Sequence, residues 1–166
     1  MKTLEITLQL NGEAKHWHIA PGDILLDVLR REGYVGAKRG CETGACGACT
    51  VLLAGKPVDA CLMFAAQADG QDIQTIEGLA EGDHLHPLQE AFLDHGAVQC
   101  GYCTPGMLLN AKAFLDQNPS PTETEVRERL SGNLCRCTGY TKPVAAILSC
   151  ATVASVSRKP VARRKS

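Results

Sequence analysis

Eight of the nine cysteines in this 166-residue sequence gather in two groups whose spacing suits the binding of metal ions. Each group contains four thiols, and thiolates are strong ligands for iron and zinc. The first group consists of Cys41, Cys46, Cys49 and Cys61. The second group consists of Cys100, Cys103, Cys135 and Cys137. The sequence therefore predicts two four-thiol metal centres, one in each half of the chain.

The loop that carries the first three thiols is built from small residues. Every residue between these thiols is Gly or Ala, except Glu42 and Thr43. Small residues let the backbone curl until several N–H groups face the sulfur atoms, and such hydrogen bonds raise the reduction potential of a cluster. The Cys-x4-Cys-x2-Cys spacing is that of plant-type ferredoxin loops, which hold a [2Fe–2S] cluster, with Cys61 expected to arrive from a neighbouring strand. A structural zinc site is the alternative.

The second group of thiols lies at the ends of predicted helices. One pair precedes a helix, and the other pair lies between two later helices. Helix N-termini carry partial positive charge and free N–H groups, which stabilise thiolates and an anionic cluster. The one-residue spacing in Cys135-Arg136-Cys137 is unusual for zinc, because it forces both thiols off one tight turn. This group therefore favours an iron–sulfur cluster more strongly than the first group does.

The remaining cysteine and a pair of histidines are predicted to be structural. Cys150 falls inside the last predicted helix and is expected to be a small buried hydrophobe. His16 and His18 alternate along a predicted strand and are expected on its solvated face. Disulfides are disfavoured throughout, because thiols so close in sequence make poor bridges.

Composition and charge exclude several kinds of partner. The formal net charge is −1, so no broad attraction to nucleic acid or to an anionic membrane is expected. The N-terminal residues lack the apolar segment of a signal peptide, and no apolar run is long enough to span a membrane. Because the signal peptide is missing, we expect a cytoplasmic protein, and in the reducing cytoplasm nine cysteines indicate metal binding or catalysis more than disulfides.

Alternating hydrophobicity predicts a sheet in the first half. Leu4–Leu10 and residues 15–19 form a predicted hairpin around a type I′ turn at Asn11-Gly12. A helix is expected at residues 24–29, with Asp23 as its N-cap and Gly33 as its C′ residue. The further strands are expected at residues 50–53, 58–61 and 72–76. This order is that of a β-grasp fold, in which a mixed sheet wraps one helix.

Helical periodicity takes over after the Gly-rich, charged residues 77–84. Four helices are predicted, the first at Pro87–Asp94. The second has Thr104 as its N-cap and Pro105 at N1, and the third begins with a capping box at Thr122–Glu125. The fourth has Pro143 at N1 and ends near Val156. We therefore predict an α+β protein with a ferredoxin domain of the plant type at residues 1–79 and a four-helix bundle domain at residues 80–157. Residues 158–166 are predicted to be a disordered basic tail.

Three motifs, in this order along the chain, resemble those of the iron–sulfur small subunit of the xanthine oxidase family of molybdenum hydroxylases. They are GCETGACGACTV at residues 40–51, QCGYCTPGM at residues 99–107 and SGNLCRCTGY at residues 131–140. The resemblance covers residues 4–156, and no ligand position departs from the family pattern. Members of this family include aldehyde, purine, carbon monoxide, isoquinoline, nicotinate and hydroxybenzoyl-CoA enzymes.

This resemblance implies two [2Fe–2S] clusters with different neighbours. The first four thiols would hold an outer cluster near a flavin or the surface, and the second four would hold an inner cluster near a molybdopterin. Gln99 matches the position that hydrogen-bonds the pterin, and Cys137 matches the cluster ligand closest to it. Arg136 is expected to have a structural or interface role. No residue of this chain is expected to be catalytic.

The resemblance also implies partner subunits. A large subunit would hold the molybdopterin, in its cytosine dinucleotide or a related form, and a medium subunit would hold FAD unless another acceptor replaces it. Electrons from substrate oxidation at the partner's molybdenum would pass singly through the inner and then the outer cluster. No molybdenum or flavin domain fits into 166 residues, so no substrate chemistry is expected on this chain alone.

Two other functions remain open from the sequence. One is an independent [2Fe–2S] electron carrier or redox sensor, which a stable monomer with both clusters would support. The other is an interaction module stabilised by zinc, which a colourless protein with bound zinc would support. An apolar patch around Gln99 and Cys137 would count against the independent carrier.

Overall fold

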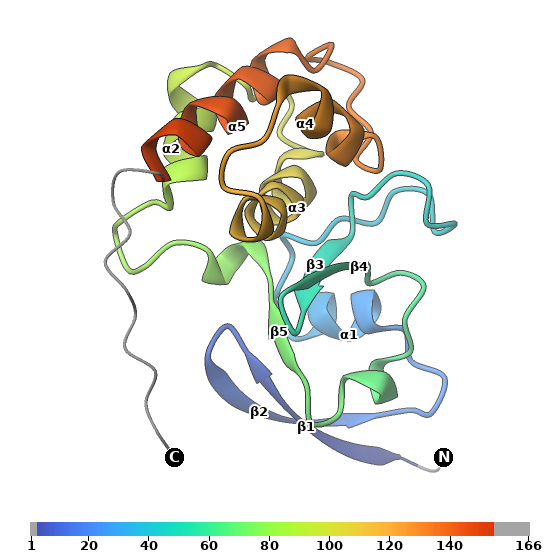
Figure 1. Cartoon of the computed structure of the whole chain (residues 1–166). Coiled ribbons are helices and arrows are strands. Elements are labelled where there is room, and N and C mark those ends of the chain that lie inside the picture. The colour runs from blue at the N-terminus through green and yellow to red at the C-terminus, as the bar shows by residue number, and fades with distance from the viewer. Residues whose placement is uncertain (1–2, 155–166) are drawn as a thin grey trace.

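A mixed sheet and a group of helices form the two halves of the computed structural model, which describes residues 3–154 (Figure 1). The strands are β1 (Leu4–Leu10), β2 (Glu13–Ile19), β3 (Thr50–Leu53), β4 (Lys56–Asp59) and β5 (Asp72–Gln74). The helices are α1 (Leu25–Arg31), α2 (Pro87–Asp94), α3 (Thr104–Gln117), α4 (Glu123–Leu130) and α5 (Thr141–Ala154), with 3-10 turns η1 (Ala65–Ala68) and η2 (Ile76–Gly78). The predicted α+β class is confirmed.

The sheet joins two hairpins through one short strand. Its strand order is β2-β1-β5-β3-β4, with β1 parallel to β5 and the other pairs antiparallel. The first hairpin turns at Asn11 and Gly12, whose φ angles of 53° and 83° confirm the predicted type I′ turn. Ala54 and Gly55 turn β3 into β4 with similar φ angles of 47° and 76°. Both turns place the strands in the register that buries one face of the sheet.

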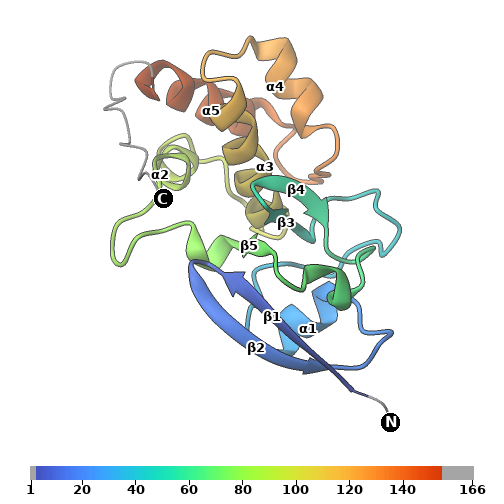
Figure 2. The ribbon, with the colours of Figure 1, turned by 60° about the horizontal axis from the view of Figure 1, so that its bottom comes forward.

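Helix α1 packs against the sheet and completes the core of the first half (Figure 2). Its fully buried residues are Leu25, Leu26, Val28 and Leu29. The C-terminal end of α1 is as predicted, because Gly33 has a φ of +93° and the next N–H, from Tyr34, donates to the Leu29 carbonyl at 2.9 Å. This left-handed turn directs the chain toward the loop that carries the first thiols.

The predicted N-cap of α1 is wrong. Asp23 makes no capping bond, because its carboxylate instead accepts the Ala20 N–H at 3.1 Å and pairs with Arg31 at 3.2 Å. The N-cap position falls one residue later, since Ile24 stays extended and bridges to Phe64. A tertiary bridge has therefore overridden a local capping signal.

Two predicted strand ends also differ from the structure. β4 stops at Asp59, so Cys61 lies in the turn after the strand rather than on it. β5 stops at Gln74, because the N–H of Thr75 donates to the side-chain oxygen of Asn11 at 2.8 Å instead of extending the ladder. The chain then enters η2 and leaves the sheet.

Helices α3 and α5, whose starts were predicted from Pro105 and Pro143, begin earlier than predicted. The N-cap of α3 is Cys103 rather than Thr104, since the carbonyl of Cys103 already accepts the N–H of Met107 at 3.1 Å. Helix α5 begins at Thr141, and Pro143 lies within its first turn rather than at its first position. A proline is tolerated there because N–H groups in the first turn have no partner within the helix.

Helices α2 to α5 pack around a second hydrophobic cluster. Helix α2 contacts α3 and α5, and α4 contacts the same two helices. The predicted capping box of α4 is present, with the Glu125 N–H donating to the Thr122 hydroxyl at 3.3 Å and the Thr122 N–H donating to the Glu125 carboxylate at 2.7 Å. The predicted end of the last helix at Val156 and the tail at 158–166 lie outside the described residues.

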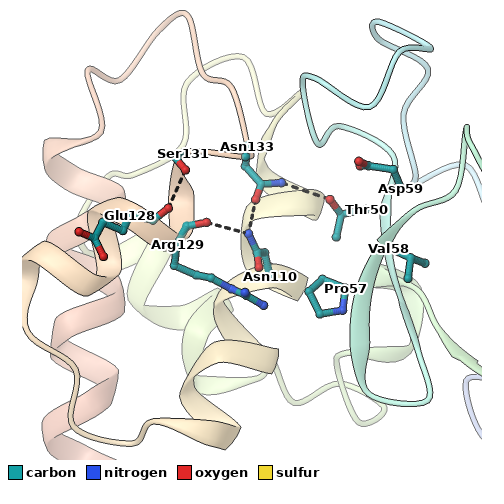
Figure 3. A pocket seen from close by; sticks show the side chains of 10 residues that line it. Thr50, Pro57, Val58, Asp59, Asn110, Glu128, Arg129, Ser131 and Asn133 are labelled. Atoms are coloured by element: carbon teal, nitrogen blue, oxygen red, sulfur yellow. Dashed lines mark hydrogen bonds between the residues drawn. The ribbon is translucent and has the colours of Figure 1, made fainter.

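Helix α3 and one asparagine join the two halves. Helix α3 packs against β3 and β4, and its Gly106 lies so close to Gly47 that a Cβ at Gly106 would fall 2.2 Å from the Gly47 carbonyl oxygen. Asn133 is 2% exposed, and its amide N–H group donates to the Gly47 carbonyl at 3.0 Å and to the Thr50 hydroxyl at 3.2 Å. Its amide oxygen accepts a hydrogen bond from Asn110 (Figure 3). Backbone contact and a buried polar network therefore hold the halves together.

We predict that Gly106→Ala destabilises the protein although alanine is the better helix former. The new methyl group would press on a backbone carbonyl that cannot rotate away, and such overpacking costs about 2 kcal/mol. A cost of that size lowers the melting temperature of a chain this long by roughly 4–8 °C, measured by circular dichroism. Gly132→Ala is the matched control, since nothing lies within 4 Å of its added Cβ. Equal melting of the two variants would contradict the proposed close contact.

Candidate metal centres

The first thiol loop curls around the sulfur of Cys41. Left-handed φ angles of 57° at Glu42 and 76° at Gly44 bend the backbone back on itself. The N–H groups of Thr43 and Ala45 consequently point at the Cys41 sulfur from 3.4 Å and 3.3 Å. The curled loop thus directs two N–H groups at this sulfur, which is the kind of donor that stabilises a thiolate or a cluster.

The pKa values of Cys41 and Cys49, two thiols of this set, are shifted in opposite directions. Hydrogen bonds from the hydroxyl and the N–H of Thr43 lower the pKa of Cys41 to about 6, and Cys46 contributes in the same direction. Burial raises the pKa of Cys49 to about 12, and Cys61 is its close neighbour. The four thiols therefore approach one another in two pairs, Cys41 with Cys46 and Cys49 with Cys61.

The second set of thiols is also paired. The sulfur atoms of Cys100 and Cys137 lie 3.6 Å apart, and both residues are exposed. Cys103 and Cys135 form the other pair, and both are half-buried. Two thiolates on one tetrahedral ion at about 2.3 Å lie roughly 3.8 Å apart, which is close to the separation of the exposed pair.

Burial and hydrogen bonding again shift the pKa values of two thiols of one set in opposite directions, and here the two thiols belong to the same pair. Burial raises the pKa of Cys103 to about 12. Burial acts in the same direction on Cys135, but hydrogen bonds from the hydroxyl and the N–H of Thr138 outweigh it and lower the pKa of that thiol. The hydrogen bond between Cys137 and Cys100 raises the pKa of Cys137. A metal ion must therefore supply the charge that ionises the buried thiols.

These features fit a binuclear iron–sulfur cluster at each set. A [2Fe–2S] cluster takes four thiolates, two on each iron, which matches two sets of paired thiols. The curled backbone around Cys41 supplies the N–H donors that such a cluster accepts on its sulfur atoms. Among residues 3–154, no group of three or more His, Cys, Asp or Glu side chains is arranged so that it could hold a metal ion as it stands.

A direct hydrogen bond connects the two thiol loops. The N–H of Leu134, which precedes Cys135, donates to the carbonyl of Cys46 at 2.9 Å. Asn133 lies beside it and clamps Gly47, the residue that follows Cys46. The roles of Asn133 and of the seam around it were missed from the sequence, because no local pattern shows that an asparagine in the second loop will be buried against the first.

The predicted pterin-contacting residues lie together on the surface. The side-chain N–H of Gln99 donates to the carbonyl of Cys137 at 3.2 Å, and both residues are exposed. Beside them is a groove of about 350 Å³, which is lined mainly by apolar side chains that include Leu85, Leu93 and Val98. Each of these three is at least 36% exposed, and Val98 precedes Gln99 in the chain, so apolar side chains reach the surface next to Gln99.

The other residues singled out from the sequence have minor roles. His16 and His18 are exposed on β2, as predicted. Cys150 is half-buried rather than fully buried, because α5 presents it to the carbonyl of Pro87 at a rim between α5 and α2. Arg136 is exposed. None of the helices within residues 3–154 has the length and apolarity needed to cross a bilayer.

Comparisons with known proteins agree with two cluster-binding units. A family model described as "2Fe-2S iron-sulfur cluster binding domain" matches residues 8–80. A second model, described as "[2Fe-2S] binding domain", matches residues 75–148. Together they cover both sets of thiols, and they favour [2Fe–2S] clusters over the structural zinc alternative.

Relatives of similar length are subunits of multi-subunit enzymes. The nicotinate dehydrogenase small FeS subunit of Eubacterium barkeri is 54% identical, over 89% of this chain and 94% of its own length. The xanthine dehydrogenase iron–sulfur-binding subunit of Escherichia coli O157:H7 is 45% identical, over 90% and 95%. The structure of quinoline 2-oxidoreductase from Pseudomonas putida 86 superposes with a TM-score of 0.90 at 45% identity, over 93% of this chain and 96% of that one. The chain therefore belongs to the iron–sulfur small subunits of the xanthine oxidase family of molybdenum hydroxylases, and it is the electron-transfer subunit of such an oxidoreductase.

Proposed function

We propose that the eight paired cysteines are the ligands of the two [2Fe–2S] clusters. Cys41, Cys46, Cys49 and Cys61 hold the outer cluster, and Cys100, Cys103, Cys135 and Cys137 hold the inner cluster. When bound, each cluster accepts and releases one electron at a time. The observation that carries the proposal is the pairing of thiols at both sites, with the sulfur atoms of Cys100 and Cys137 only 3.6 Å apart.

The chain's own residues fix the order and spacing of the two sites. The hydrogen bond between the Leu134 N–H and the Cys46 carbonyl joins the ligand loops directly. A continuous path of covalent bonds and this one hydrogen bond therefore connects Cys46 to Cys135. Asn133 holds the same loops together from inside the seam. A short fixed separation is what fast electron exchange between two one-electron centres requires, since small misplacements slow a reaction strongly.

We further propose that the face around Gln99 and Cys137 docks on a large subunit that holds molybdopterin, in its cytosine dinucleotide or a related form. The amide oxygen of Gln99 is the acceptor for a pterin N–H, while its N–H group stays on the Cys137 carbonyl. The apolar groove beside Gln99 supports a permanent partner and counts against an independent carrier. A medium FAD subunit, or another acceptor, receives the electrons near the outer cluster.

The domain organisation is part of the same proposal. Residues 1–79 act as a β-grasp ferredoxin domain, and residues 80–157 act as a four-helix bundle that holds the inner cluster. The two hydrophobic clusters of the molecule support this division, because one involves the sheet and α1 and the other involves α2 to α5. Nine cysteines without a disulfide suit the reducing cytoplasm, where we place the complex.

The ligand assignment is tested by removing one half-buried thiol from each set. The complex is purified with its partners, reduced with dithionite and examined by EPR and iron analysis. We expect two distinguishable signals and about four irons per chain in the native protein. Cys61→Ser should abolish only the outer signal, and Cys103→Ser only the inner one. Cys150→Ser is the control and should keep both signals; loss of a signal in this variant, or retention of both in either ligand variant, would refute the assignment.

Thiol acidity in the metal-free protein gives a second test. Because the pKa of Cys41 is lowered to about 6, this thiol is largely ionised at about pH 7, whereas Cys103, with a pKa raised to about 12, stays protonated. Only the thiolate reacts with iodoacetamide, so we expect Cys41 to be alkylated first at about pH 7 and to lose this advantage below about pH 5. Mass spectrometry of digested protein measures both rates. Equal alkylation at about pH 7 would show that the loop does not stabilise the Cys41 thiolate.

The role of Gln99 is tested by Gln99→Leu in the assembled complex. Nicotinate, xanthine and quinoline, which appear in the names of relatives, are tried as reductants, and the compound that reduces the native complex is kept. Loss of one hydrogen bond of about 1.4 kcal/mol should slow the appearance of the inner-cluster signal about tenfold. Reduction by dithionite should be unchanged. Gln9→Leu, on the exposed side of β1, is the matched control. If substrate reduces the inner cluster at the same rate in both variants, Gln99 has no role in the transfer of electrons from the partner.

A further inference from the structure

The turn after the last two thiols presents a hydroxyl group to one of them. The hydroxyl oxygen of Thr138 lies 3.1 Å from the sulfur of Cys135, and the N–H of Thr138 lies 3.5 Å from the same sulfur. A hydroxyl this close to a sulfur is within hydrogen-bonding range. The Thr138 hydroxyl thus faces a thiol of the second set, as the Thr43 hydroxyl faces Cys41 in the first set.

The direction of this hydrogen bond follows from the other partner of the hydroxyl. The N–H of Tyr140 lies 3.2 Å from the Thr138 oxygen and can only donate, so the oxygen accepts there. The single hydroxyl proton is thereby left for the sulfur of Cys135. The Thr138 hydroxyl therefore donates to the sulfur of Cys135, and the hydrogen bond from the Tyr140 N–H fixes its orientation.

Tyr140 holds the whole turn in this arrangement. Its φ of +66° is rare for a residue with a large side chain, which shows that the surrounding contacts impose this backbone conformation. Its phenol oxygen accepts the N–H of Cys135 at 2.8 Å, and its O–H donates to the carbonyl of Asn133 at 3.2 Å. The same phenol thus ties the ligand turn to Asn133, which is buried at the seam. Thr138 therefore faces Cys135 from a rigid support.

We propose that Thr138 raises the reduction potential of the inner cluster through this hydrogen bond, with Tyr140 as the positioning residue. The inference rests on the proposed function, since it takes Cys135 as a ligand of that cluster. Reduction adds one electron and breaks no bond, so the charge on the cluster and its thiolates becomes one unit more negative. A donor at a thiolate sulfur is stronger in the more negative state and favours it. The hydroxyl thus makes the inner cluster the better acceptor for electrons from the molybdenum subunit.

The experiment compares Thr138→Val with Thr138→Ser in the assembled complex. Valine keeps the shape of threonine without the hydroxyl, and serine keeps the hydroxyl. The midpoint potential of each cluster is measured by EPR during titration with dithionite and mediators, and the signals are assigned with the Cys61→Ser and Cys103→Ser variants. We expect Thr138→Val to reduce the equilibrium constant for inner-cluster reduction about tenfold, which is a fall of about 59 mV for one electron. The outer cluster and the serine variant should stay within the error of the native values.

Three results would overturn the proposal. They are an unchanged inner potential in Thr138→Val, an equal shift of both clusters, and the same shift in the serine variant. If Thr138→Val does not retain its iron, the test is made by proton ENDOR on the native complex. The reduced inner cluster should then show a coupling to a proton that exchanges in D2O, and Thr138→Ser should keep this coupling. The absence of that coupling also refutes the proposal. Failure of the ligand assignment is seen separately, as a native protein with fewer than two signals or without iron.

Discussion

The rest of the structure depends on one buried amide at the seam between the two halves. Asn133 is 2% exposed, and it places donors on Gly47 and Thr50 while accepting from Asn110. A buried amide is stable only when its polar atoms are paired, so this network allows one relative position of the loops that carry the thiols. Gly47 and Gly106 let the backbones meet at that position. The distance between the two sites is thereby set by the fold and not by the clusters alone.

Acidity at the thiols links each centre to folding. Cys41 and Cys135 have lowered pKa values because hydrogen bonds stabilise their thiolates, whereas burial raises the pKa values of Cys49 and Cys103. A partly exposed thiol that ionises easily can bind iron first, and a buried thiol loses its proton only when the metal charge is present. Cluster insertion therefore releases protons and contributes its binding free energy to the stability of the folded chain.

The sequence was sufficient for most of the helices and strands, because these depend on local patterns. Alternation predicted β1 and β2, and the Thr122 capping box predicted α4. Close cysteine spacing did not show that Cys100 would lie beside Cys137, because these thiols come from separate loops. Long-range contacts account for most of the errors. Asp23 is not a cap because Ile24 bridges to Phe64, and Asn133 went unrecognised because its partners lie far away in the sequence. The capping position of α3 was also wrong by one residue, but for a local reason, since the Cys103 carbonyl already accepts the first hydrogen bond of the helix.

The exposure of the inner thiols explains why such a chain serves as a subunit. Cys100 and Cys137 are exposed, and the groove beside Gln99 adds apolar side chains to the same region. A cluster at that position in a free chain would meet water and oxygen, and its apolar surroundings would promote association. The proposed docking of a large subunit on this region would remove both problems and would bring the partner's redox centre close to Cys137. On that proposal, the surface that makes the isolated chain vulnerable is also the surface through which it receives electrons.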